Sequence, residues 1–290
     1  MSRTTDLILT ALAPAIWGST YYVTTEFLPQ GYPVTLAVLR ALPAGLLLLL
    51  LVRQLPPRAW LGRVFLLGAF NFAIFWVLLF IAAYRLPGGV AATLGATQAL
   101  IVLGLARLAL GSPVRPLAVL AALAGLGGVA LLLLRPGAAL DPLGVAAGLG
   151  GAVSMAAGTV FSRKWQPPVP PLTFTAWQLT AGGLLLVPVA LLSEPALSAG
   201  NIGGLLYLGL IGAALTYMLW FRGVARIEPG AVAMLGMMSP VTAVLLGWVL
   251  LGQALSPVQM TGAATVLASV WLGQRAARGK LPRPLRARPA

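Results

Sequence analysis

The feature that most constrains the fold of this chain is an internal duplication, in which a hydrophobic pattern returns 141 positions later. The matched residues are Leu67 and Leu208, Phe80 and Phe221, Arg85 and Arg226, Leu94 and Leu235, Leu110 and Leu251, and Pro116 and Pro257. Near the start of each copy the offset is 138, as between Pro33 and Pro171. Tandem copies of a hydrophobic unit are typical of membrane carriers, because two related halves can form a site between them and move about it.

The composition places this duplication in a lipid bilayer. Of the 290 residues, 59% are apolar and only 8% are charged, and the mean hydropathy is +0.95. A soluble globular protein has about 25% charged residues, so this chain could not cover itself with polar surface in water. The sequence contains no Cys and no His, which removes thiolate chemistry and the commonest metal ligand. We therefore expect no catalytic residue, no cofactor and no metal site.

The formal net charge of +14 raises the question of nucleic-acid binding. The Lys and Arg residues lie between apolar runs and do not form one basic face interleaved with aromatic residues, so we exclude a nucleic-acid partner. The expected partners are a small-molecule substrate and the lipid bilayer. The oligomeric state stays open, and a monomer is compatible with the sequence.

Ten apolar runs are long enough to span a membrane as helices, which takes about 20 residues each. They are continuous and do not alternate with polar residues, which favours helices over a barrel. The predicted spans are 7–26, 34–53, 63–82, 89–109, 115–134, 142–161, 172–192, 203–222, 230–250 and 257–274. Short loops rich in Pro and Gly separate them. The predicted fold class is an all-α integral membrane protein.

The distribution of positive charge predicts the orientation. With ten spans, 16 of the 19 Lys and Arg residues fall on the side that holds both termini, Arg85 and Arg135 fall on the other, and Arg40 lies within a span. Cytoplasmic loops are enriched in Lys and Arg, so both termini are predicted to be cytoplasmic.

Each copy holds five spans, and this odd number determines how the copies are related. The second copy must start on the opposite side of the membrane, so the duplication is an inverted repeat with a pseudo-two-fold axis in the membrane plane. We predict a first repeat at 1–137, a second at 138–275, and a basic cytoplasmic tail at 276–290 that contacts anionic lipid.

Short motifs support a family resemblance. The segment 15–19 (Ala-Ile-Trp-Gly-Ser) and the segment 33–40 (Pro-Val-Thr-Leu-Ala-Val-Leu-Arg) resemble the first and second helices of the drug/metabolite transporter superfamily, in its EamA-type branch. Leu110-Gly111 and Leu251-Gly252 lie where that branch usually has Gly-Glu, with Ser112 and Gln253 in place of Glu. Within the branch, the chain is most similar to YddG-type amino-acid exporters. This resemblance implies export of aromatic and other neutral amino acids across the inner membrane of a bacterium by alternating access.

The position of the acidic residues bears on energy coupling. All five lie at span ends or in loops: Asp6, Glu26, Asp141, Glu194 and Glu228. A carboxylate proton relay needs an acid within the membrane, so we favour a facilitative carrier. A carrier of nucleotide sugars or drug-like solutes is the alternative, although polyanionic substrates would favour several cations at the site. An intramembrane enzyme would need acids, His or Cys at membrane depth, so the chain is predicted not to be an enzyme.

Arg40 is the one clear charge within a span. It could anchor a substrate carboxylate or form a gating ion pair; equally, it could extend to the membrane surface or bond to a backbone carbonyl. Its counterpart in the second repeat is Gln178. Farther along, Gln98 corresponds to Ser239, next to Pro240. Since proline has no N–H, we expect the ninth helix to bend and leave the carbonyl of Gly236 free.

Aromatic and small polar residues at mid-span complete the expected site, because flat rings with polar tips suit apolar side chains carrying backbone groups. Aromatic residues near span ends more often belong to the interfacial belt, as we expect for Trp60, Trp165 and Trp271. The predicted substrate-binding residues are Trp17, Tyr21, Arg40, Asn71, Phe75, Trp76, Gln98, Ser154, Met155, Thr159, Gln178, Thr216, Tyr217 and Ser239. Gly144 and Gly148 are expected to serve close helix packing. The fifth and tenth spans are expected to be peripheral.

Overall fold

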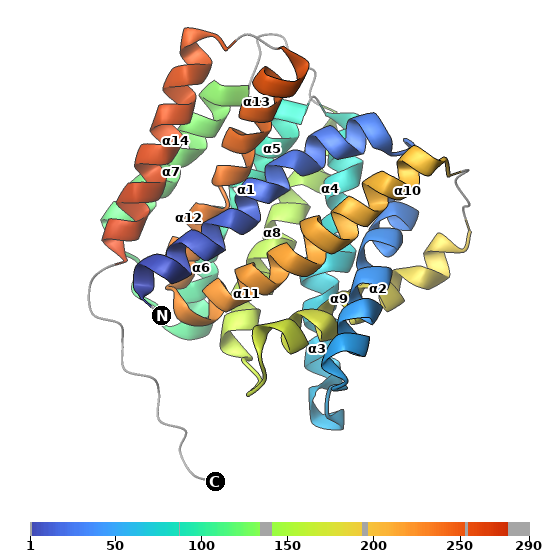
Figure 1. Ribbon diagram of the computed structural model, residues 1–290. Coiled ribbons are helices and arrows are strands. Elements are labelled where there is room, and N and C mark those ends of the chain that lie inside the picture. Colours follow the sequence, from blue (N-terminus) through green and yellow to red (C-terminus); the bar gives the residue numbers. More distant parts are fainter. Residues whose placement is uncertain (1, 87, 134–140, 193–196, 253–254, 278–290) are drawn as a thin grey trace.

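The computed structural model describes residues 2–86, 88–133, 141–192, 197–252 and 255–277, and these parts form a bundle of helices (Figure 1). The side chains of Tyr21, Thr25 and Leu251 lie outside the description. The predicted basic tail lies outside it as well, apart from Ala276 and Ala277. All the long regular elements in the described ranges are helical.

Ten helical segments follow one another along the described chain, and each overlaps one predicted span. They are α1 (Arg3–Phe27); α2 (Pro33–Val52); η1 (Arg58–Trp60), α3 (Leu61–Gly68), η2 (Ala69–Ala73) and α4 (Ile74–Arg85) in series; α5 (Gly88–Ala96) with α6 (Gln98–Leu110); α7 (Pro116–Leu133); α8 (Pro142–Lys164); α9 (Pro171–Ala190); α10 (Ala199–Leu206), η3 (Tyr207–Leu215) and α11 (Thr216–Arg226) in series; α12 (Pro229–Leu235) with α13 (Met238–Leu251); and α14 (Pro257–Ala276).

In the part of the chain that the structure describes, nine helices are long and apolar enough to cross a membrane. The tenth segment, α14, has 20 residues but is less apolar, because it carries Gln259 and Gln274. The ten segments divide into two sets of five. The predicted architecture, an all-α membrane protein of two five-helix repeats, is confirmed.

The helices begin and end where the local sequence requires it. Proline occupies the first turn of α2, α8, α9, α12 and α14, where a missing N–H costs nothing. Gly111 and Gly252 end α6 and α13 with positive φ angles of 66° and 63°, a conformation that suits glycine. The Leu-Gly pairs at 110–111 and 251–252 therefore end a helix in both copies.

The packing follows the two-fold relation between the repeats. The second helix of each copy packs on the other, as α2 against α9, and the fifth helices pair likewise as α7 and α14, which lie side by side in Figure 1. The first helix α1 packs against α11 and α13, and its counterpart α8 packs against α4 and α6. Gly128 and Gly262 lie at the α7–α14 crossing, where each would bring an added Cβ against the other's backbone.

Two kinds of irregularity also occur in both copies. The π-helical segment 69–73 corresponds, by the 141-residue offset, to positions 210–214 inside the π-helical segment 207–215. The fourth span is interrupted at Thr97, whose N–H bonds to the carbonyl of Leu94 at 3.1 Å. The ninth is interrupted at Gly236 and Met237. Such π segments and 3₁₀ turns often mark functional positions.

The ninth helix is interrupted where a bend was expected, but one detail differs from the expectation. The carbonyl of Gly236 is not free, because it accepts a hydrogen bond from the N–H of Ser239 at 3.1 Å. A tight turn there replaces the bond that Pro240 cannot make.

Candidate functional site

A cavity lies between the two repeats, and eight of the predicted substrate-binding residues line it. Its volume, counted as space for the centres of water molecules, is about 130 Å³. One such position needs about 10–15 Å³, so the cavity can hold several waters or a small organic solute. The predicted residues among its lining are Trp17, Arg40, Phe75, Trp76, Gln98, Met155, Tyr217 and Ser239. Helices of both copies supply them.

The lining residues can be placed along the bundle. We call the end where α1 begins and α14 terminates the N side, and the opposite end the far side (Figure 1). Trp17, Thr20 and Arg40 lie in the far-side half of α1 or α2, whereas Tyr217, Trp220 and Ala233 lie in the N-side half of their spans. Neither α7 nor α14 contributes a described lining residue, as expected for peripheral helices.

Aromatic rings form one wall of the cavity. The ring centroid of Trp17 lies 4.9 Å from that of Tyr217 and 5.2 Å from that of Trp220. Trp76 lies 6.0 Å from Tyr217 in an edge-to-face arrangement, and Phe72 packs behind both. Rings at these separations stabilise one another beyond their burial, so the wall is held in place before any solute arrives.

Arg40 is buried, with 2% of its surface exposed, and so does not extend to the membrane surface. Its Nη2 donates to the carbonyl of Gly212 at 2.9 Å, and its Cζ lies 4.3 Å from the ring centroid of Trp76. Its Nε has no hydrogen-bond partner. One of the expected alternatives, a bond to a backbone carbonyl, is therefore present, and the same side chain also lines the cavity.

The carbonyl of Gly212 joins Arg40 to Trp17. Besides Arg40, it accepts a hydrogen bond from the Thr216 hydroxyl at 2.9 Å, and that hydroxyl accepts one from Trp17 Nε1 at 2.8 Å. Gly212 belongs to the π-helical segment η3. The irregular helix thus orients the cation and one ring of the wall together.

The other predicted residues lie behind the lining or outside the description. Asn71 Nδ2 donates to Gln178 Oε1 at 2.8 Å and to Ser162 Oγ at 3.2 Å, in a buried cluster between η2, α8 and α9. Ser154 donates to the carbonyl of Phe70 at 2.8 Å. The remaining three are Thr159, which is fully buried, Thr216, described above, and Tyr21, whose side chain the structure does not describe.

Two polar lining residues are absent from the predicted set. Thr20 follows Trp17 by three positions and Trp220 follows Tyr217 by three. Residues three apart share a helix face, so this spacing could have found both. Gly144 and Gly148 serve close packing as expected, because a Cβ at either would meet Leu86 or Leu94 closely, and Gly148 also lines the cavity.

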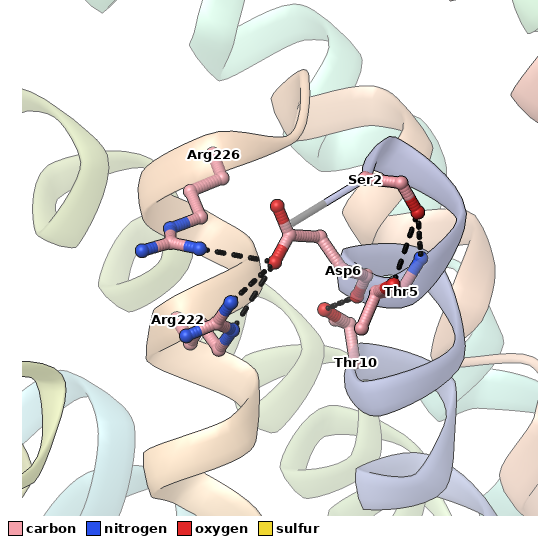
Figure 2. Close-up of polar contacts among 6 residues, drawn as sticks. All are labelled: Ser2, Thr5, Asp6, Thr10, Arg222 and Arg226. Carbon is pink, nitrogen blue, oxygen red and sulfur yellow. Dashed lines mark hydrogen bonds and ion pairs between the residues drawn. The ribbon is translucent and has the colours of Figure 1, made fainter.

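An ion cluster joins α1 to α11 on the N side, as Figure 2 shows. Asp6 Oδ1 accepts from Arg222 Nη2 at 2.8 Å, from Arg222 Nε at 3.1 Å and from Arg226 Nη1 at 3.1 Å. Ser2 caps this turn of α1, accepting from the N–H of Thr5 at 3.2 Å. The cluster holds the N-side ends of the two helices together.

The contact continues one turn deeper, toward the cavity. The Thr10 hydroxyl donates to the carbonyl of Asp6 at 2.6 Å, and Thr10 is fully buried. A Cβ added to Gly223 would overlap the Thr10 side chain. Together with the ion cluster, this close approach holds α1 against α11 at the N side.

A weaker ion pair joins α4 to the start of α8 at the far side, although the repeat counterpart of Asp6 is Gly144 and not Asp141. Arg85, the repeat counterpart of Arg226, lies with its Nη1 3.4 Å from Asp141 Oδ2. These side chains are 47% and 37% exposed, whereas that of Asp6 is 12% exposed. In this conformation the N-side contact is tight and its far-side counterpart is loose.

Comparison with known proteins identifies the family. The model of the EamA-like transporter family matches residues 5–134 and again 142–273. "Protein PecM" of Dickeya dadantii is 44% identical over 267 residues, covering 90% of each chain. "Uncharacterized inner membrane transporter YedA" of Escherichia coli is 30% identical over 265 residues, covering 89% of this chain and 86% of its own.

A solved structure shows the same fold. It superposes with a TM-score of 0.81 at 22% identity, covering 96% of this chain and 99% of its own. The two matched halves of the family model correspond to the two five-helix sets between which the cavity lies. This multi-pass membrane protein therefore belongs to the EamA-like transporter family.

Proposed function

We propose that this protein is a secondary transporter that exports small neutral metabolites, above all aromatic and other neutral amino acids, by alternating access. The observation that carries the proposal is the cavity between the two repeats, and we infer that the Asp6 cluster closes its N side. A site at the repeat interface is the arrangement that rocking of one half against the other requires.

The two related ion pairs support an alternating cycle. In an inverted repeat, exchanging the conformations of the copies exchanges the two faces of the protein. The tight contact of Asp6 and the loose contact between Arg85 and Asp141 would then exchange roles. We place the N side in the cytoplasm of a bacterial inner membrane, because it carries most of the Lys and Arg residues. The present conformation is then outward-facing.

The lining supports the choice of substrate. Its rings suit an aromatic or aliphatic side chain, and Gln98 and Ser239 offer neutral hydrogen-bonding groups. Arg40 is the one cation among the lining residues in the described ranges, which disfavours phosphorylated sugars and nucleotide sugars, since these carry several negative charges. No described lining residue is acidic, which favours facilitated over proton-coupled transport.

Transport in proteoliposomes tests the proposal. Purified protein is reconstituted, loaded with an unlabelled amino acid and exposed to radiolabelled Phe, Trp, Leu, Ser and Glu without an imposed proton gradient. We expect accumulation of the aromatic and neutral amino acids and none of Glu. Failure of every solute in the panel would contradict amino-acid transport, and a strict requirement for a proton gradient would contradict the facilitative mechanism.

A further inference from the structure

Three buried polar atoms that have no hydrogen-bond partner in the described part of the chain belong to residues lining the cavity. They are Arg40 Nε, Thr20 Oγ1 and Trp220 Nε1. The two N–H groups can only donate, and the threonine hydroxyl can donate as well. A buried donor without an acceptor is costly. The three atoms are themselves fully buried, so a solute that brings acceptor oxygens into the cavity would satisfy them once their side chains turn toward it.

The charge of Arg40 also lacks a counterion. Among the residues that the structure describes, the ion pairs involve Asp6 and Asp141, and neither of these lines the cavity. A buried cation without a counterion is unfavourable, because its lost hydration is not replaced. A negative charge on the bound solute would serve as the counterion of Arg40.

The guanidinium of Arg40 is held in place but not neutralised. One of its nitrogens bonds to the carbonyl of Gly212, and its plane is supported by the ring of Trp76. These contacts fix its position while leaving Nε without an acceptor. A positioned guanidinium suits a carboxylate, because its N–H groups match the two carboxylate oxygens in geometry.

The repeat shows that this arrangement is specific to one copy. The contact of Arg40 with Gly212 corresponds, by the offsets of 138 and 141, to the contact of Gln178 with Asn71. In the second case two neutral amides bond to each other, and neither residue lines the cavity. The crossing of α9 with η2 is therefore built without a charge. The equivalent crossing of α2 with η3 does not by itself require arginine.

We infer that Arg40 binds the carboxylate of the transported solute, with Thr20 and Trp220 as additional donors, and that the solute carries one carboxylate on an apolar, aromatic body. The rings of Trp17, Trp76 and Tyr217 would contact that body. The inference rests on the proposed transport function. It covers zwitterionic aromatic amino acids and plain aromatic carboxylic acids, whose shared chemistry is the carboxylate.

Binding to the purified wild-type protein tests the ligand chemistry without any variant. Isothermal titration calorimetry in detergent compares 3-phenylpropionate, L-phenylalanine and phenethylamine, which share a ring and differ in their charged groups. We expect the two carboxylates to bind and phenethylamine not to bind. The inference is overturned if phenethylamine binds as tightly as the carboxylates, or if neither carboxylate binds.

Substitution then tests the residue. Arg40→Gln installs the side chain that the chain itself has at position 178, and we expect it to weaken carboxylate binding about tenfold to a hundredfold, as for loss of a charge-assisted hydrogen bond. Arg40→Lys keeps the charge but not the planar group, so its affinity for the carboxylates should fall between those of the wild type and Arg40→Gln. Arg63→Gln is the matched control, since it removes an exposed arginine that contacts Trp60 outside the cavity. Equal affinity in the wild type and Arg40→Gln would overturn the assignment.

The outcomes separate this inference from the proposed function. Arg40-dependent binding without transport in proteoliposomes supports the carboxylate site and contradicts the transport proposal. Binding of 3-phenylpropionate but not of L-phenylalanine supports the carboxylate site and contradicts amino-acid export. Amino-acid transport that is unchanged in Arg40→Gln upholds the function and overturns the carboxylate site. If Arg40→Gln does not fold, the comparison of the three ligands on the wild type decides.

Discussion

Replacing Asp6 by asparagine should open the N side of the bundle. Asn keeps the size of the side chain and an acceptor oxygen but removes the charge that holds Arg222 and Arg226. Three charge-assisted hydrogen bonds converge on one oxygen, and such bonds are about twice as strong as neutral ones. Arg222 contributes most, because its side chain is 19% exposed, whereas that of Arg226 is 46% exposed and its interaction is screened by solvent.

The expected loss is about 2 kcal/mol, taking about 1.5–3 kcal/mol for the partly buried charged hydrogen bonds to Arg222 and little for the more exposed one to Arg226. If the cluster forms only while the N side is closed, this loss acts on the equilibrium between closed and open states. A change of about 2 kcal/mol shifts that equilibrium about thirtyfold toward the state open on the N side.

Cysteine labelling measures this shift. The chain contains no Cys, so Thr10→Cys provides a single thiol at a fully buried position beneath the cluster. When opening is fast relative to labelling, the rate of maleimide labelling follows the population of the open state. The protein with both Thr10→Cys and Asp6→Asn should therefore be labelled about thirtyfold faster than the protein with Thr10→Cys alone. Its elution volume on size exclusion should be unchanged.

Asp141→Asn is the matched control for that experiment. It removes the charge from the exposed, 3.4 Å pair with Arg85 while keeping a side chain that can cap α8 through Gly144. An exposed pair contributes about 0–1 kcal/mol, so the labelling rate should fall by less than about fivefold. A rate in Asp6→Asn within threefold of the parent, or an equal rise in Asp141→Asn, would refute the role of the cluster in closure.

Further predictions concern packing and the cavity. Gly158→Ala should destabilise the fold by about 1–3 kcal/mol, because the added Cβ would overlap Asn71. Thermal melting in detergent measures this loss. In the control Gly127→Ala, the added Cβ meets no described atom within 4 Å, so the melting temperature should stay unchanged or rise. Gln98→Ala should reduce proteoliposome uptake about fivefold, as for loss of one neutral hydrogen bond, with no change in melting temperature. Trp17→Phe should lower both uptake and stability slightly, since it removes the donor to Thr216. Wild-type kinetics in both cavity variants would contradict the proposed lining.

The site shows how far sequence reasoning reaches for individual residues. The mid-span position of Trp17, Arg40, Gln98 and Tyr217 made them candidates for the site, and all four line the cavity. The same reasoning selected Asn71, which bonds to Gln178 behind the lining. Both kinds of residue are polar at the same membrane depth, and the side toward which each points depends on helix rotation and crossing, which a single hydrophobic sequence with little amphipathic contrast does not reveal.

The backbone irregularities illustrate a second limit. Pro240 signals the interruption of the ninth helix because it lacks an N–H. No proline marks the interruption at Thr97, whose own hydroxyl donates to the carbonyl of Leu94 at 2.6 Å. The two π-helical segments likewise have no distinctive residue type. Their positions depend on how each helix meets its neighbours, so only the packed structure locates them.

The sequence alone determined the class of the protein, the number of spans and the relation between the copies. These follow from composition, the length of apolar runs and an odd number of spans per copy, and lipid permits few alternatives because every backbone polar group must be satisfied within the membrane. Only the tertiary structure decided that Arg40 is buried against Trp76 and that Asp6 reaches Arg222 across 216 positions. Such contacts join residues far apart in the chain, and they arise from the crossing of helices that are each compatible with many other neighbours.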